Sequence, residues 1–321
     1  MKKLITIMTP AYNEEKVLPI LFERLKNLAS KNSKYDFEFL FINDGSRDKT
    51  IEIIKNESQK DFRISYIDLS RNFGKENAML AGFDYAKGDA LVIIDADLQD
   101  PPELIPKMIE LWEQGFDDVY AKRESRDGET WLKKATSKWF YSILDKISHI
   151  EIQRDTGDFR LLDRRAVEAL KTLRESNRYT KGMFSWVGFK KKEITYKRDP
   201  RAAGETKWNY FKLLNLAIEG ITSFTTSPLR ISLWTGLIIS VSAFAWAAFL
   251  IIRKIFFGAD MSGYTSLMSA ILLLGGVQLV SIGIIGEYIG RIFTESKNRP
   301  VYLAQEIKEY SREKSSKQTK K

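Results

Sequence analysis

The sequence predicts an α/β domain with a mostly parallel sheet, followed by a transmembrane hairpin of two helices. In the N-terminal part of the chain, short apolar runs rich in β-branched or aromatic residues alternate with segments of helical periodicity. This order is typical of α/β layer sandwiches. Towards the C-terminus, two long runs contain no charged residue. The mean hydropathy of −0.28 resembles that of a soluble protein because it averages the two parts.

The α/β part is expected to begin with four strands, each followed by a helix. Ligands on such sheets bind beyond the carboxyl ends of the strands, so the polar residues there are the first candidates for a site. The expected strands are Leu4–Met8, Phe37–Ile42, Ile64–Leu69 and Leu91–Ile94. The expected helices are Glu15–Ala29, Lys49–Ser58, Glu76–Ala86 and Pro102–Gln114.

The two uncharged runs are long enough to cross a membrane. The run from Ile231 to Ile252 would extend roughly 33 Å as a helix, and a hydrocarbon core is about 30 Å thick. A second run extends from Tyr264 to Gly286. A pair of buried core helices is the alternative, but two such runs joined by one short segment are more typical of a transmembrane hairpin. We expect spans at about 231–252 and 264–289.

Charge predicts how the hairpin is oriented. Two spans leave residues 1–230 and the tail, residues 291–321, on the same side of the membrane. That tail holds nine Lys or Arg and four Asp or Glu, an excess of five positive charges. The positive-inside rule therefore places both ends in the cytoplasm of a bacterial cell, although Arg253 and Lys254 in the connecting segment weaken the bias.

A further amphipathic segment precedes the first span. Apolar residues recur at helical spacing from Trp208 to Ile221, and polar residues fall mostly on the opposite side. Such a helix can lie in the membrane interface; packing on the α/β domain is the alternative. The expected organisation is 1–207 as the α/β domain, 208–229 as the interfacial region, 230–290 as the hairpin and 291–321 as a basic tail.

Composition narrows the chemistry. The chain has no cysteine and a single histidine, His149, which excludes disulfides, thiol nucleophiles, iron–sulfur clusters and zinc held by Cys or several His. A metal must therefore be bound by oxygen, which favours Mg²⁺ or Mn²⁺. The net charge of +9 suits an anionic partner, but aromatic–basic platforms for nucleic acid are not evident. Neither a G-x-G-x-x-G after the first strand nor a P-loop motif occurs, so phosphates must be bound by a metal and cationic side chains.

Acidic residues follow the predicted strands. Asp95 and Asp97 come directly after a buried run, and two carboxylates so spaced can hold a hard cation whose other ligands are the oxygens of a diphosphate. Asp44 follows the second strand and suits hydrogen bonding to a base or ribose, although turn and N-cap roles are common in such segments. Asp158 and Arg160 flank an aromatic residue just before a strand-like run. Asp-x-Asp triplets also occur by chance in surface loops. The position of this triplet at the expected ligand edge is therefore the observation that supports a binding role.

Six segments taken together resemble the polyprenyl-phosphate glycosyltransferases of glycosyltransferase family 2, the branch similar to dolichol-phosphate-mannose synthase. They read TPAYNEE, NDGSRDKT, SRNFGKENAMLAGFDYAKGD, DADLQDPPE, GDFRLLDR and RAAGETKW. The similarity covers the whole chain, because bacterial two-span members have the same C-terminal hairpin. It implies a GT-A fold and the transfer of a sugar, with inversion, from a nucleotide diphosphate to undecaprenyl phosphate in the plasma membrane. The product would be a lipid-linked sugar for modification of cell-envelope glycans.

The resemblance also implies roles for individual positions. Asp95 and Asp97 would bind the divalent metal and the diphosphate. Asp158 matches the position usually proposed as the catalytic base. The positions expected to line the nucleotide-sugar pocket are Pro10, Tyr12, Glu14, Asp44, Asp95 and Gln99.

Three basic residues match positions expected near the donor or acceptor phosphates: Arg160, which is also a catalytic candidate, Arg201 and Lys207. Contact with the membrane interface beside Trp208 is the alternative for the last two. The acceptor itself raises a question about Asp158, because a phosphate monoester has a second pKa of about 6 and is mostly deprotonated at pH 7. We therefore hypothesise that Asp158 orients the site or handles residual protonation, and that positioning by cationic groups matters more than base catalysis.

Several alternatives remain open at this stage. UDP-glucose and UDP-N-acetylglucosamine are the favoured donors, with GDP-mannose as a third option. A processive polysaccharide synthase would share the fold, but its Q-x-x-R-W segment and additional spans are missing here. A catalytically silent membrane scaffold is opposed by the intact acidic residues. Small residues at Gly275, Gly276, Gly283 and Gly286 would allow helix packing in a homo-oligomer.

Overall fold

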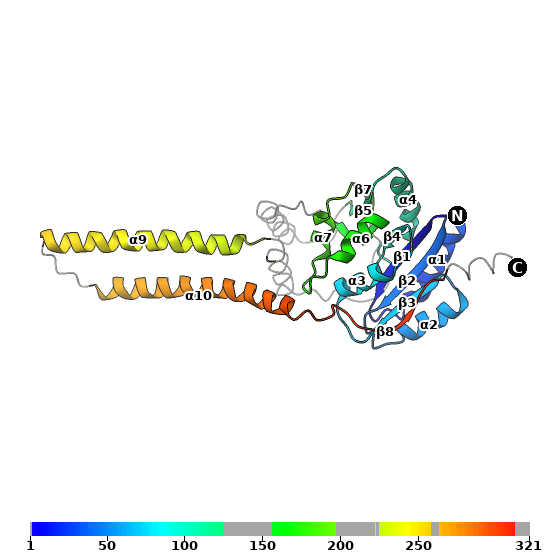
Figure 1. Cartoon of the computed structure of the whole chain (residues 1–321), viewed down its shortest axis with the longest axis horizontal. Coiled ribbons are helices and arrows are strands. Elements are labelled where there is room, and N and C mark those ends of the chain that lie inside the picture. Colours follow the sequence, from blue (N-terminus) through cyan, green and yellow to red (C-terminus); the bar gives the residue numbers. More distant parts are fainter. Residues whose placement is uncertain (1, 125–155, 197–221, 223–224, 258–262, 312–321) are drawn as a thin grey trace.

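The computed structural model describes residues 2–124, 156–196, 222, 225–257 and 263–311. It contains an α/β domain from which two long helices extend side by side (Figure 1). The expected interfacial region, 208–229, lies mostly outside the described residues, as do Arg201 and Lys207.

The described strands form one mixed sheet in the order β7-β5-β6-β4-β1-β2-β3-β8. Strands β1 to β5 and β7 run in one direction, whereas β6 and β8 run in the other. Their bounds are β1 Leu4–Ala11, β2 Asp36–Asn43, β3 Ile64–Leu69, β4 Ala90–Ile93, β5 Asp118–Arg123, β6 Thr156–Asp163, β7 Lys191–Tyr196 and β8 Ala304–Lys308.

Helices cover both faces of the sheet, so the central strands are buried on both sides and read as continuous apolar runs. In β2, Phe39 and Phe41 point into one core, and Leu40 and Ile42 point into the other, as the two-residue period of a strand requires. On the first face lie α1 (Leu18–Lys31), α2 (Thr50–Lys60), the short 3₁₀ turn Pro102–Leu104 and α4 (Ile105–Glu113). On the second face lie α3 (Lys75–Tyr85), α6 (Arg164–Thr172) and α7 (Thr180–Trp186).

The predicted α/β domain is therefore confirmed. The third expected strand has the bounds that were predicted, and the other strands and the helices are present with their ends moved by a few residues. The first strand is longer than expected because it continues through Pro10 to Ala11. Pro10 lies beyond the last β1–β4 pair, Met8 with Ile93, so its missing N–H costs no hydrogen bond to β4. The sheet thus opens between β1 and β4 at their carboxyl ends. This is also where the strand order reverses, the usual ligand position in open α/β sheets.

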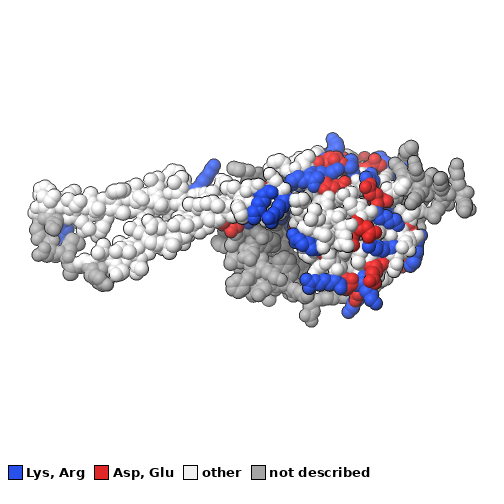
Figure 2. Space-filling view, turned by 60° about the horizontal axis from the view of Figure 1, so that its bottom comes forward, with Lys and Arg blue, Asp and Glu red and all other residues white. Residues whose placement is uncertain are grey.

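The C-terminal hairpin consists of α9 (Ser227–Phe257) and α10 (Tyr264–Ser296). Both are long and apolar enough to span a membrane, with a mean hydropathy of 2.2 over their best windows and none of those residues buried. In Figure 2 the two helices are almost free of charged side chains, whereas positive and negative residues alternate over the α/β domain. The predicted membrane hairpin is confirmed, and its helices are longer than the expected spans.

Strand β8 is not among the strands that the sequence pattern predicts. After α10 the chain returns to the α/β domain and pairs antiparallel with β3 at the edge of the sheet. Side chains support this contact: the Tyr302 hydroxyl donates to Asp84 at 2.7 Å, and the Tyr66 hydroxyl donates to Glu306 at 2.6 Å. Part of the expected basic tail is therefore a strand of the sheet.

Candidate active site

Strand direction brings the acidic candidates together. The parallel strands β1 to β4 all end at one edge of the sheet, and β6 begins there because it runs the opposite way. Ile93 of β4 pairs with Arg160 of β6. Continuing that register places Asp95 opposite Asp158, so two carboxylates from distant parts of the sequence face each other across the open end of the sheet.

A lysine connects these two carboxylates. The Nζ atom of Lys75 lies 2.6 Å from Oδ1 of Asp95 and 2.5 Å from Oδ2 of Asp158. The Asp158 side chain is only 12% exposed, that of Asp95 is 25% exposed, and that of Lys75 is 41% exposed. Lys75 belongs to the SRNFGKENAMLAGFDYAKGD segment, but no role for it is predicted from the sequence, since one lysine at the start of a helix has no signature of its own.

Electrostatics around Asp158 favour its ionised form. Burial alone would raise the pKa of Asp158, but the charges of Lys75 and Lys181, the hydrogen bond from Lys75 and the charge of Arg160 together lower it to about 2. Burial likewise opposes the charged form of Lys75, yet Asp158 and Asp95 raise its pKa above the ordinary lysine value. The pKa of Glu76 is raised, first by burial and then by the neighbouring Asp158. A carboxylate with so low a pKa is a weak base, which fits the hypothesis of an orienting role.

Asp44 is buried and supports the segment that carries Lys75. Its carboxylate accepts hydrogen bonds from the backbone N–H groups of Phe73 at 2.7 Å and Gly74 at 3.1 Å, directly before α3. Burial raises the pKa of Asp44, although these bonds oppose the shift. Gly45 has a φ of +64°, and a Cβ there would lie 2.3 Å from the carbonyl carbon of Arg71. The turn after β2 and the turn before α3 are therefore packed backbone against backbone.

Beyond β1, a second pair of turns is joined by hydrogen bonds. The Asn13 N–H donates to Ser46 Oγ at 3.0 Å, and the Glu14 N–H donates to Thr50 Oγ1 at 2.8 Å. Asn13 adopts a positive φ of 58°, which lets the chain turn from β1 towards α1. Tyr12 is 42% exposed at this edge. These contacts hold the predicted nucleotide-pocket residues of β1 next to those of β2.

The segment after β4 also forms a compact turn. The Gln99 N–H donates to Asp97 Oδ1 at 3.1 Å, and Leu98 has a positive φ of 59°. The Tyr196 hydroxyl donates to the buried carboxylate of Asp100, which fixes the far end of the turn to β7. Asp97 and Gln99 are thereby held at the same edge as Asp95.

The acidic residues supply part of the coordination of a hard cation, which a bound diphosphate would complete. Within the described residues, no group of three or more acidic or histidine side chains is arranged to hold a metal ion. Asp95 and Asp97 nevertheless supply two carboxylates at the open end of the sheet, and oxygen donors of this kind fit Mg²⁺ or Mn²⁺ when a diphosphate completes the coordination. Asp95 also forms an ion pair with Lys75.

The Arg160 side chain is more deeply buried than expected for a residue that contacts a phosphate. Its side chain is 1% exposed, its Nη1 donates to Asp118 Oδ2 at 2.9 Å, and its guanidinium stacks 3.7 Å from the ring centre of Phe184. No exposed surface remains through which Arg160 could contact a lipid phosphate. It acts on the site through its charge, which helps to keep Asp158 ionised.

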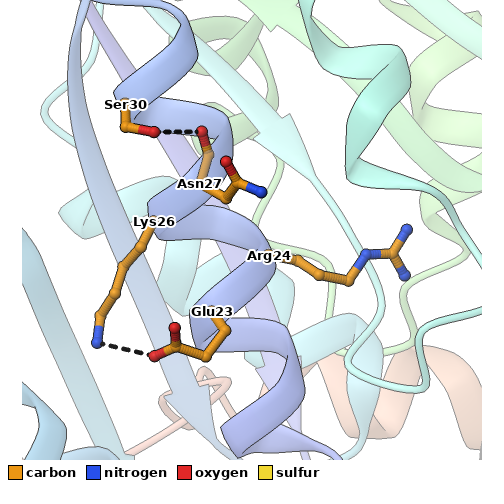
Figure 3. Close-up of a pocket in the computed structure, with 5 residues that line it drawn as sticks. All are labelled: Glu23, Arg24, Lys26, Asn27 and Ser30. Atoms are coloured by element: carbon orange, nitrogen blue, oxygen red, sulfur yellow. Dashed lines mark hydrogen bonds and ion pairs between the residues drawn. The ribbon is translucent and has the colours of Figure 1, made fainter.

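A depression of about 500 Å³ lies on the outer surface of α1, away from these residues. Because α1 runs back from the carboxyl edge of the sheet, the C-terminal half of this helix lies towards the opposite edge. Arg24 pairs with Glu103 at 2.6 Å, and Lys26 pairs with Glu57 at 2.5 Å, so its basic groups are already engaged. The five lining residues are Glu23, Arg24, Lys26, Asn27 and Ser30 (Figure 3).

Comparison with known proteins agrees with this architecture. Residues 6–171 match Glycosyl transferase family 2, and residues 227–292 match the GtrB C-terminal hairpin. An uncharacterized glycosyltransferase from Synechocystis is 49% identical over 94% of this chain and 95% of its own length. The prophage bactoprenol glucosyl transferase homolog of Escherichia coli and the bactoprenol glucosyl transferase of Shigella phage SfV are each 46% identical over 95% of this chain and 99% of their own lengths.

Solved structures with a similar chain path include glucosyl-3-phosphoglycerate synthase from Mycobacterium tuberculosis in complex with Mn²⁺ and UDP-glucose. It is 16% identical, with a TM-score of 0.47, over 68% of this chain and 77% of that chain. The family match spans most of the α/β domain, and the full-length relatives align along both the domain and the hairpin. The chain is therefore a member of glycosyltransferase family 2, with a GT-A-type catalytic domain and a GtrB-type membrane hairpin.

Proposed function

We propose that this enzyme transfers a single sugar, with glucose favoured, from a UDP-sugar to undecaprenyl phosphate on the cytoplasmic face of a bacterial plasma membrane. The observation that carries the proposal is the Asp95–Lys75–Asp158 cluster at the open end of the sheet, in a chain whose hairpin would bring a lipid acceptor to the same protein. The names of the relatives that align along nearly the whole chain support bactoprenol, a polyprenyl alcohol, as the acceptor lipid and glucose as the sugar.

The donor would bind across the carboxyl ends of β1, β2 and β4. Tyr12 and Asp44 would contact the nucleoside, and Asp95 and Asp97 would hold Mg²⁺ or Mn²⁺ together with the diphosphate. When bound, such a cation supplies Lewis-acid stabilisation of the charge on the leaving group. Gln99 is held next to these carboxylates, where its amide can donate to a phosphate or sugar oxygen.

The reaction needs little proton transfer. An oxygen of the lipid phosphate attacks the anomeric carbon, the bond from that carbon to the diphosphate oxygen breaks, and the electron pair leaves with the nucleoside diphosphate. Because the acceptor phosphate is mostly a dianion at neutral pH, no strong base is required. Asp158, with its pKa lowered to about 2, is suited to orient Lys75 and the reacting groups instead.

The hairpin would place both substrates at one surface. The acceptor carries its phosphate at the membrane interface, while the donor is water soluble, so the catalytic edge of the sheet must lie close to that interface. Arg201 and Lys207 would contact the phosphates from a segment that lies outside the described residues.

The test is a transfer assay with the full-length chain in lipid nanodiscs that contain undecaprenyl phosphate. UDP-glucose, UDP-N-acetylglucosamine and GDP-mannose would each be supplied with Mn²⁺, with Mg²⁺ or with a chelator, and products identified by mass spectrometry. We expect one glucose per lipid from UDP-glucose, loss of product with the chelator, and loss of product in Asp97→Asn. Longer sugar chains would indicate a processive synthase, and no lipid-linked sugar from any donor would overturn the proposal.

A further inference from the structure

Lys75 occupies an unusual position for a cation. It is the first residue of α3, immediately after Gly74, which has a φ of +91°. A positive side chain is unfavourable at the N-terminal end of a helix because the helix dipole is positive there. The placement is nevertheless enforced by the buried carboxylate of Asp44, which holds the two preceding N–H groups. The two short ion pairs with Asp95 and Asp158 offset the unfavourable placement.

The carboxylates need a cation between them. Like charges directly opposite each other on neighbouring strands destabilise a sheet. The β4–β6 register, continued two residues beyond the pair of Ile93 with Arg160, places Asp95 opposite Asp158. The ammonium of Lys75 lies between them and is partly exposed. Lys75 therefore neutralises the same carboxylate, Asp95, that the proposed function assigns to the divalent metal.

Two cations cannot occupy one carboxylate independently, because their charges repel each other. We infer that Lys75 is a built-in counter-ion that competes with the divalent metal for Asp95 and is displaced from Asp95, but not from Asp158, when the metal binds. This inference rests on the proposed function, because it assumes that Asp95 is a metal ligand. Once released from Asp95, the ammonium remains at the end of α3, where the leaving diphosphate would develop its charge. Lys75 is thus a positioning residue that couples donor binding to the arrangement around Asp158.

If Lys75 competes with the metal for Asp95, removing the lysine should strengthen metal binding and not weaken it. In full-length protein without any nucleotide, Lys75→Met should bind Mn²⁺ about tenfold more tightly than wild type, or about 1.4 kcal/mol, because its competitor is gone. Free Mn²⁺ can be measured directly by electron paramagnetic resonance during a titration. Sugar transfer by Lys75→Met should fall, since the group that orients Asp158 has been removed.

Three further variants make the result decisive. Lys75→Gln is neutral but can still donate hydrogen bonds to both carboxylates, so it should fold and should also bind Mn²⁺ more tightly. Lys75→Arg retains the charge and should remain close to wild type in Mn²⁺ affinity. Lys181→Met removes a nearby positive charge that acts on Asp158 while leaving the Lys75 bridge intact, and its Mn²⁺ affinity should change much less.

Unchanged or weaker Mn²⁺ binding in both Lys75→Met and Lys75→Gln would overturn the inference. If wild type still formed a lipid-linked sugar with Mn²⁺, the proposed function would stand even though the inference about Lys75 had failed. Absence of Mn²⁺ binding in both wild type and Lys75→Met would overturn the competition, and the transfer assay would show separately whether the enzyme acts on lipid without a metal.

Discussion

At the scale of single residues, the candidate site consists of one lysine ammonium between two carboxylates. Asp95 follows β4, Asp158 lies in β6 and Lys75 begins α3, and the lysine forms an ion pair with both carboxylates. The sequence indicated both carboxylates, because Asp95 directly follows one apolar run and Asp158 precedes another, and both patterns are visible in a single chain. It could not indicate their lysine partner, since that contact exists only once the antiparallel register of β4 and β6 is formed.

Substitution of Asp158 tests whether it acts as a base. A group whose pKa is lowered to about 2 is fully ionised from pH 6 to pH 8.5, so its contribution should not vary over that range. We expect Asp158→Asn to reduce the transfer rate on the order of 10²-fold, through misplacement of reacting groups, by the same factor at both pH values. Initial rates with saturating donor provide the measurement. Recovery of the variant at high pH would instead favour a base.

At the scale of elements, β6 determines how the site is built. It is an antiparallel strand inserted between β4 and β5, and it starts where the parallel strands end. Its residues alternate between the two faces of the sheet: Phe159 faces one core, while Asp158 and Arg160 lie on the other face. The first four strands and helices could be predicted because each is a local pattern. The pairing of β6 and β8 could not, because their partners are remote in sequence and β8 is short and largely polar.

The buried ion pair between β5 and β6 should contribute strongly to stability. Arg160→Met leaves the carboxylate of Asp118 buried without its partner, and we expect a loss of about 3 to 5 kcal/mol. The double variant Arg160→Met with Asp118→Leu should recover much of this loss, since no unpaired charge remains. Thermal unfolding of the detergent-solubilised protein would measure both.

Arg165→Met is a matched control for this pair. Arg165 also binds an aspartate, Asp117 at 2.5 Å, but its side chain is 73% exposed. Its loss should therefore cost less than about 1 kcal/mol. Equal losses for the two arginines would contradict a stabilising role that depends on burial.

At the scale of the whole molecule, orientation in the membrane decides whether the substrates can meet. The chain contains no cysteine, so a single introduced thiol reports on one position only. Ser33→Cys places it on the exposed surface of the α/β domain, and Gly263→Cys places it at the start of α10, at the far end of the hairpin.

We expect a membrane-impermeant maleimide to label Gly263→Cys in intact cells and Ser33→Cys only in inverted vesicles. This follows from the excess of positive charge in residues 291–321, which favours the cytoplasm for both chain ends. Labelling of Ser33→Cys in intact cells would reverse the orientation and place the catalytic domain on the wrong side for a cytoplasmic nucleotide sugar.

The return of β8 to the sheet has a consequence for biogenesis. On the ribosome, β3 is made long before β8, and the entire hairpin must be synthesised between them. Until that moment the outer edge of β3 exposes unpaired N–H and C=O groups, which invite pairing with other chains. The domain thus completes its sheet only after the membrane helices have left the ribosome. A fragment ending before Ser227 would lack β8 altogether and retain this open, aggregation-prone edge.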